Sequence, residues 1–80
     1  MSTAMRAEQA TFSEALTWLK NGYKVARAGW NGKGQWVKLQ LPDENSKMTE
    51  PYLYIKNAQD GLVPWLASQG DLLAADWMIV

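Results

Sequence analysis

The chain contains neither cysteine nor histidine, and this absence restricts how so short a sequence can hold a fold together. A domain of 80 residues buries only roughly 60% of the surface that its unfolded chain exposes, so the core alone leaves a small margin of stability. Disulfides and the usual zinc ligand sets are excluded as added support. Oligomerisation is the remaining common device, and we expect copies of the chain to associate.

Tryptophan and charge content narrow the class of ligand. Five tryptophans are far above ordinary usage, and because so small a core has trouble enclosing them all, some are expected at a subunit interface or a ligand site. Eight basic residues balance eight acidic ones. This balance argues against a binder of nucleic-acid polymers, which needs excess positive charge, but it is compatible with one small phosphorylated ligand.

The apolar runs and the first residues indicate where the protein works. No apolar run approaches the roughly 20 residues needed to cross a bilayer, so no membrane partner is expected. The first ten residues, MSTAMRAEQA, lack the basic start and apolar middle of a signal peptide, which favours the cytoplasm. Residues 1–10 are expected to form a flexible tail before a single ligand-binding domain at 11–80.

The clearest local signal predicts a helix at residues 12–20. The run TFSE places Thr11 at the N-cap and Glu14 three residues later, which is a capping box. Apolar residues then recur at helical spacing, at Phe12, Ala15, Leu16 and Leu19. Asn21 and Gly22 tolerate the left-handed conformation at a helix end, so the helix is expected to stop there.

The rest of the chain reads mainly as strands. Alternation of large and polar residues predicts strands at 23–28, 35–41, 52–56 and 76–80, and a short apolar run at 62–63 continues a strand as far as Pro64. Ser68 caps a short helix predicted at 71–75. The order α-β-β-β-α-β predicts an α+β fold, in which helices pack against one small antiparallel sheet.

Catalysis has little support in the sequence. Without histidine or cysteine, no spacing resembles a paired-carboxylate, Ser-Lys or nucleotide-loop motif. We therefore predict a binding protein, not an enzyme, with no cofactor and no metal. A weak nucleotide hydrolase stays open as an alternative.

The stretch AGWNGKGQW at residues 28–36 is the first candidate site. Gly32 and Gly34 can bring backbone amides close to an anion, and Lys33 adds a positive charge beside them. Trp30 and Trp36 offer flat faces on which a base or a sugar ring stacks. In the plainer interpretation, Trp36 is a core residue of its strand and the glycines only make a turn.

The second candidate site is the stretch VPWLASQGDLLAADW at residues 63–77. Asp71 accepts hydrogen bonds and does not donate them, so it suits ribose hydroxyls or a base edge, although a plain helix cap explains it equally well. Asp76 and Trp77 are expected to fix the last strand, with Trp77 buried.

Together, these stretches resemble a small phage and prophage family first catalogued as a domain of unknown function. The motifs ARxGWNGK and VPWLASQxDLLAxDW carry the resemblance, which covers about residues 12–80 apart from the polar loop at 42–50. Characterised members of the family act as the second type of Thoeris anti-defence protein.

The resemblance implies a sponge that works in the cytoplasm of a bacterial host. Such proteins bind a cyclic nucleotide immune signal, a glycocyclic ADP-ribose isomer, and hold it without cleaving it. Family members form homotetramers from dimers, with ligand pockets between subunits, and some hold cyclic oligonucleotides at separate sites.

Carried onto this sequence, the family motifs imply a set of ligand-binding residues: Arg27, Trp30, Asn31, Gly32, Lys33, Trp65, Ser68, Gln69 and Asp71. By hypothesis, Trp30 stacks on the base, while Arg27 and Lys33 face the pyrophosphate. In the same hypothesis, the edges of the ribose or the base are hydrogen-bonded by Asn31, Gln69 and Asp71.

This chain departs from the family at a short acidic loop at 42–50 and at residues 1–11, which precede the usual start. A multimeric phage protein that binds a saccharide or another nucleotide, or that serves a structural role, is the alternative from another class. Cations beside the aromatic rings favour phosphate over sugar.

Overall fold

The computed structural model describes residues 10–80, and it has the α+β fold that the sequence predicts. The element order is α-β-β-β-β-α-β, one strand more than the predicted order. The helices are α2 (Phe12–Lys20) and α3 (Gln69–Leu73), and the strands are β1 (Val25–Arg27), β2 (Trp36–Gln40), β3 (Tyr52–Lys56), β4 (Leu62–Pro64) and β5 (Trp77–Ile79). None of the helices in residues 10–80 has the length and apolar character needed to cross a membrane.

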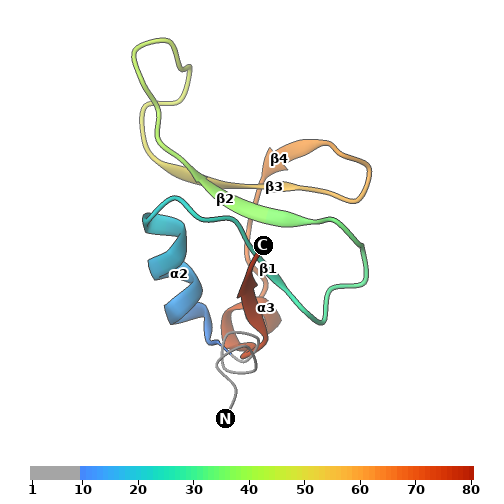
Figure 1. The fold of residues 1–80 in the computed structure, drawn as a ribbon. Coiled ribbons are helices and arrows are strands. Elements are labelled where there is room, and N and C mark those ends of the chain that lie inside the picture. Colours follow the sequence, from blue (N-terminus) through green and yellow to red (C-terminus); the bar gives the residue numbers. More distant parts are fainter. Residues whose placement is uncertain (1–9) are drawn as a thin grey trace.

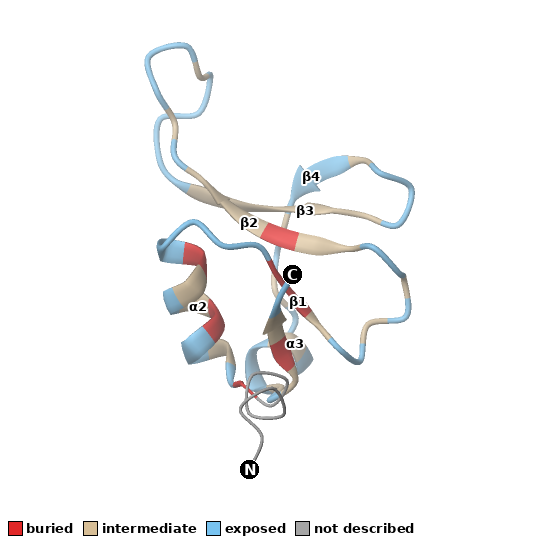
Figure 2. Cartoon of the chain, viewed as in Figure 1, coloured by how far each residue is buried: buried red, intermediate tan, exposed pale blue. Residues whose placement is uncertain are grey.

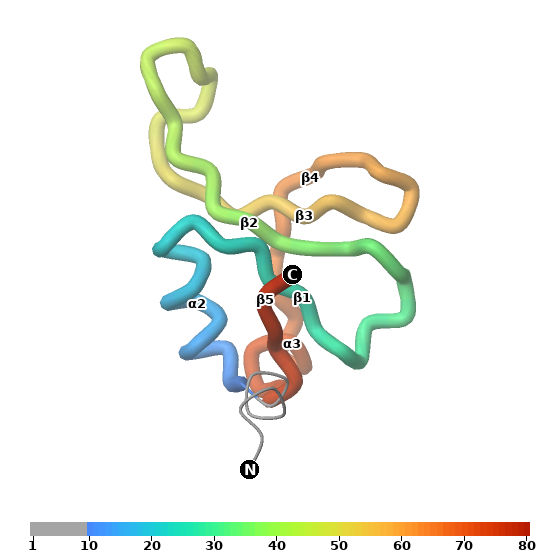
Figure 3. Tube along the Cα trace, in the orientation of Figure 1, coloured from blue at the N-terminus to red at the C-terminus, as the bar shows by residue number. Residues whose placement is uncertain are grey.

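The strands form one antiparallel sheet in the order β4-β3-β2-β1-β5 (Figure 1). The chain therefore returns at its end to place β5 beside β1, as Figure 3 shows. The short run at 62–63 does form a strand, β4, and it lies at the edge of the sheet. Pro64 fits there because an edge strand needs donors on one side only.

Helix α2 begins and ends where the sequence predicts. The Glu14 amide donates to Thr11 Oγ1 at 3.4 Å and the Thr11 amide to Glu14 Oε1 at 2.9 Å, so the capping box is confirmed. At the other end Gly22 has a φ of 91°, which glycine adopts without strain. Ala15 and Leu19 form the buried side of the helix.

Helix α3 begins two residues earlier than predicted. Ser68 Oγ accepts from the Asp71 amide at 3.0 Å, and Asp71 Oδ2 accepts from the Ser68 amide at 3.2 Å. This second capping box places Asp71 at the third helical position, so the helix spans Gln69–Leu73 and the prediction of 71–75 is wrong. The physical reason is that a cap residue directly precedes the first turn.

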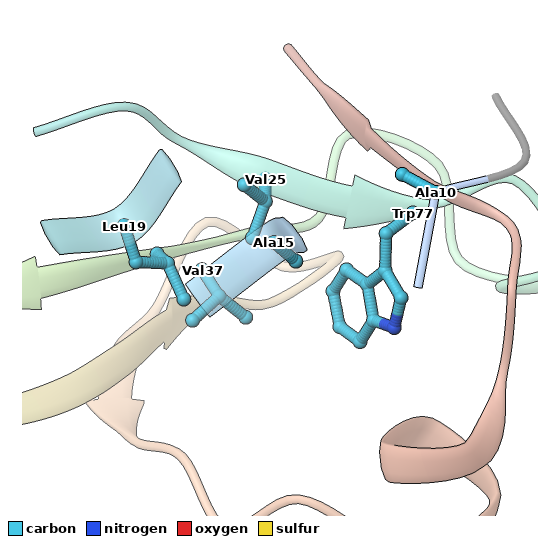
Figure 4. Close-up of a cluster of buried hydrophobic side chains, with 6 residues drawn as sticks. All are labelled: Ala10, Ala15, Leu19, Val25, Val37 and Trp77. Carbon is cyan, nitrogen blue, oxygen red and sulfur yellow. The ribbon is translucent and has the colours of Figure 1, made fainter. Parts of the chain in front are cut away.

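The core lies between α2 and one face of the sheet (Figures 2 and 4). Its buried residues are Ala10, Ala15, Leu19, Val25, Val37 and Trp77. Trp77 is completely buried, as predicted. Ala10, which the sequence places in the tail, is buried and forms a β-bridge with Trp77, whereas residues 1–9 of that tail lie outside the described residues.

The opposite face of the sheet carries aromatic and basic side chains. Trp36 lies there because its neighbour Val37 points into the core. Its ring packs edge-on against Tyr54 at 5.9 Å, and Lys24 Nζ lies 4.9 Å from the ring centre. Trp36 is half-buried and outside the core cluster, so its interpretation as a core residue is wrong.

Ile79 is exposed even though it shares the core-facing side of β5 with Trp77. It pairs with Val25 at the end of an edge strand, and 44% of its surface is accessible. Alternation along a strand places the two side chains on one face, but only Trp77 belongs to the core cluster.

Candidate functional site

The loop at 28–35, which we call the glycine loop, connects β1 to β2 (Figure 3) and is hydrogen-bonded to Asp76, directly before β5. The Ala28 amide donates to the Asp76 carbonyl at 3.0 Å, and the Gly29 amide donates to Asp76 Oδ2 at 2.8 Å. The Trp30 amide closes a turn on the Arg27 carbonyl at 3.2 Å. The first half of the loop is therefore held at a defined place beside the sheet.

Arg27 joins the two sequence motifs. Its Nε donates to Asp76 Oδ1 and its NH1 donates to Asp71 Oδ1, each at 2.8 Å. These two hydrogen-bonded carboxylates raise the pKa of Arg27, the contact with Asp76 having the larger effect. Within residues 10–80 the guanidinium NH2 has no hydrogen-bond partner, so its donors remain for a ligand.

Asp71 accepts three hydrogen bonds from three different segments. Its Oδ1 accepts from Arg27 and from Trp30 Nε1 at 3.2 Å, while Oδ2 accepts from the Ser68 amide. Burial alone would raise the pKa of Asp71, but these donors outweigh it and the pKa lies below its ordinary value. About one accepting position is left on Oδ2, because a carboxylate has roughly four.

Asp76 is held in a similar way at the start of β5. Burial raises the pKa of Asp76, but the hydrogen bonds from Arg27 and the Gly29 amide lower it by more, so the net shift is downward. The sequence predicts only that Asp76 fixes the last strand. The sequence signal at this position is an acidic residue directly before a tryptophan, and that signal does not identify Arg27 as the partner of the carboxylate.

Trp30 packs against the aromatic edge of the core. Its ring centre lies 5.5 Å from that of Trp77 and 6.4 Å from that of Trp65, both in edge-on geometry. Trp77 Nε1 in turn donates to the Asp71 carbonyl at 3.0 Å. Trp30 is half-buried, so part of its ring faces outward while the rest is held by neighbours.

A hollow of about 270 Å³ opens beside the glycine loop, and we call it the loop hollow. It is lined by Ala26, Arg27, Ala28, Trp30, Gly32, Lys33, Gly34, Gln35, Trp36, Met78 and Val80. Four of the predicted site residues thus surround one space: Arg27, Trp30, Gly32 and Lys33. Lys33 is exposed, and Trp36 and Met78 complete the wall from the sheet.

The remaining predicted site residues do not line this hollow. Trp65 packs against Trp30, and the Ser68 amide donates to Asp71, which also lies outside the lining. Asn31 and Gln69 are exposed and lie outside the lining, Gln69 at the first position of α3. The structure therefore brings the first motif to a surface and places most of the second motif as its support.

A larger groove of about 710 Å³ lies on the sheet near β4 and is absent from the sequence predictions. Its lining is Gln40, Met48, Thr49, Glu50, Pro51, Tyr52, Tyr54, Leu62, Val63 and Pro64. Glu50 is the single charged residue of this lining, and it repels anions. The smaller loop hollow, with Arg27 and Lys33, is therefore the better candidate for a phosphorylated ligand.

Comparison with known proteins gives the chain its family. The model of the Thoeris anti-defense 2-like domain matches residues 10–80, which includes both motifs and every residue of the loop hollow. A protein of Bacillus phage SP01 named "Thoeris anti-defense 2" is 37% identical over 83 aligned residues, which cover 88% of this chain and 93% of the phage protein. The chain therefore belongs to the Thoeris anti-defense 2-like family.

Proposed function

We propose that this protein binds a cyclic nucleotide immune signal of the glycocyclic ADP-ribose type, holds it without cleavage, and so prevents activation of a Thoeris effector. Family membership supports an anti-defence role. The observation that carries the proposal of a nucleotide is the loop hollow, where Arg27 and Lys33 lie beside Trp30, Trp36 and a glycine-rich backbone. Cations and amides suit phosphate, while aromatic faces suit a base.

The roles of the predicted residues follow their positions. Lys33 and the free NH2 of Arg27 contact the pyrophosphate, and the Gly32 backbone approaches it closely. The outward part of Trp30 stacks on the base. Asp71 offers its remaining acceptor to a ribose hydroxyl while its other contacts hold Arg27 and Trp30 in place.

Association of subunits completes the proposed pocket. Asn31 and Gln69 are exposed outside the loop hollow, so a second copy is the simplest source of further contacts to a ligand. Large apolar side chains favour such association, since Leu66 is 92% exposed and Leu73 is 84% exposed. A homotetramer, with separate sites for cyclic oligonucleotides, is the assembly that we propose for the host cytoplasm.

Sequestration requires tight binding. To remove a signal present near about 1 μM, the dissociation constant must be in the nanomolar range, about −12 kcal/mol. A pocket closed between subunits can reach this affinity because charge-assisted hydrogen bonds contribute about 1.5–3 kcal/mol each in a site shielded from water.

Isothermal titration with glycocyclic ADP-ribose, followed by denaturation and identification of the released molecule, tests the proposal. Nanomolar binding with intact ligand supports a sponge, whereas a cleaved product would identify a hydrolase. Lys33→Met is expected to weaken binding about 10- to 100-fold, through loss of one charged contact. Lys47→Met, an equal change in the exposed loop at 42–50, is the control and should bind like the parent.

A saccharide or another nucleotide is the second candidate ligand. The observation that favours a saccharide is the pairing of Arg27 with two carboxylates, which reduces the positive charge at the loop hollow. A panel of cyclic oligonucleotides and neutral sugars in the same titration separates these ligands. If the titration gives heat of binding with a neutral sugar and none with the nucleotides, the saccharide is the ligand and our proposal is refuted.

A further inference from the structure

Asp76 holds three consecutive residues at the point where the chain leaves β1. Its carbonyl accepts from the Ala28 amide at 3.0 Å, Oδ1 accepts from Arg27 Nε at 2.8 Å, and Oδ2 accepts from the Gly29 amide at 2.8 Å. Arg27 and Gly29 are separated from Asp76 by 49 and 47 positions along the chain. One residue directly before the last strand, β5, thus anchors the start of the glycine loop.

Gly29 shows how closely the carboxylate approaches the loop. A Cβ atom at this position would lie 2.8 Å from Asp76 Oδ2, nearer than such atoms can come without one of them moving. The backbone itself does not require glycine here, because the glycines with positive φ in residues 10–80 are Gly22 and Gly34. A side chain at position 29 would therefore displace the carboxylate from its present place.

We propose that Asp76 is a positioning residue that sets the path of the glycine loop and so preforms the loop hollow before any ligand arrives. Trp30, Gly32 and Lys33 follow the anchored residues directly and line that hollow. Asparagine cannot replace the carboxylate, because both oxygens accept from N–H groups and an amide nitrogen would face one of these donors. Preformed loops bind more tightly because less conformational freedom is lost on binding.

The direct test is amide hydrogen exchange in protein labelled with ¹⁵N-glycine, which has six glycine signals. In Asp76→Asn, exchange at Gly29 is expected to rise about tenfold or more, since the one oxygen of asparagine stays on the charged Arg27 and the amide nitrogen then faces the Gly29 N–H. Gly61 is the internal control, because its amide donates to Asn57 Oδ1 at 2.8 Å in another turn. Unchanged exchange at Gly29, or an equal rise at both glycines, would overturn the positioning role.

Asp43→Asn is the matched variant. It removes the same charge from an exposed carboxylate whose Oδ1 accepts from the Asn45 amide at 2.9 Å, in the loop at the opposite end of β2 from the glycine loop. Exchange at Gly29 should stay at the parent rate in this variant. A rise equal to that in Asp76→Asn would mean that net charge, not the local contact, controls the loop.

A double-mutant cycle tests the same contact from the other side. Gly29→Ala is expected to push the carboxylate away and to loosen the loop, as judged by exchange of the Trp30 backbone amide. Once Asp76→Ala has removed the carboxylate, adding Gly29→Ala should change that exchange less than twofold. Equal effects of Gly29→Ala in both backgrounds would show that the alanine acts independently of Asp76.

The consequence for binding rests on the proposed function. Asp76→Asn should weaken the binding of glycocyclic ADP-ribose about tenfold or more, as changes to supporting residues commonly do, while Asp43→Asn should bind like the parent. Parent affinity in a variant whose loop is loosened would refute a role in the site. If the parent protein itself does not bind this ligand, the proposed function fails, and the exchange data still decide the positioning role.

Discussion

At the scale of single residues, the site is organised by two carboxylates around one guanidinium. Arg27 bridges Asp71 and Asp76, with 23% of its own side chain accessible and 13% and 29% of theirs. This partly buried group is costly to break at Arg27, because removing the guanidinium leaves both carboxylates without their charged partner. The three residues should therefore behave as one unit in mutational experiments.

This unit predicts how stability depends on pH. The net pKa shifts of Asp71 and Asp76 are downward from the ordinary value of 3.8, so the unfolded chain binds protons first as the pH falls. Their contribution is complete above that value and is lost as the pH falls through the folded-state pKa values. Urea denaturation between about pH 6 and pH 2 should show this loss, reduced in Asp76→Asn. An identical pH profile in that variant would contradict the assignment.

At the scale of elements, both helices begin with the same reciprocal cap but serve different purposes. Helix α2 supplies the buried Ala15 and Leu19, whereas α3 has no buried residue of its own. The short helix α3 instead orients Asp71, whose side chain faces back to Ser68, Arg27 and Trp30. Its cap therefore connects local structure to the candidate site.

The two caps offer a direct comparison. Thr11→Ala and Ser68→Ala should each reduce the free energy of unfolding by about 1 kcal/mol, because each removes one capping hydrogen bond. Ser68→Ala should in addition shift the indole N–H signal of Trp30, since Asp71 loses the helical turn that aims it. Thr11→Ala should leave that signal unchanged. Equal shifts in both variants would show that α3 has no special connection to Trp30.

At the scale of the whole molecule, one face of the sheet is covered and the other is open. Helix α2 packs on the covered face, while the loop hollow and the larger groove both include residues of the opposite face, such as Trp36 and Tyr54. The exposed leucines near α3 add a second apolar region. Together these surfaces fit a small domain that gains stability by association.

Leu73 tests that expectation. Leu73→Lys should lower the assembled mass measured by light scattering, because a charge replaces an apolar side chain that is 84% exposed in the single chain. The subunit fold should persist, as judged by circular dichroism, because Leu73 contributes nothing to the core. Gln59→Lys, at an exposed turn, is the control. A parent protein that is monomeric at all concentrations would contradict the proposed assembly.

Local chemistry determined much of this fold from the sequence. The capping box at Thr11, the helix end at Gly22 and the strand at 52–56 depend on neighbours within a few residues, so the pattern of the chain predicts them. The pattern identifies Ser68 as a cap but favours a first turn two residues too late, so it does not predict the start of α3.

Tertiary structure alone decided the partners of those elements. Alternation shows which residues share a face, but not how far that face is covered, so it does not predict the half-buried Trp36 or the exposed Ile79. The pairing of Arg27 with Asp71 and Asp76 joins residues 44 and 49 positions apart. Such contacts form only when the return of β5 beside β1 brings the two motifs together, because side chains separated by that length of chain meet only through the fold.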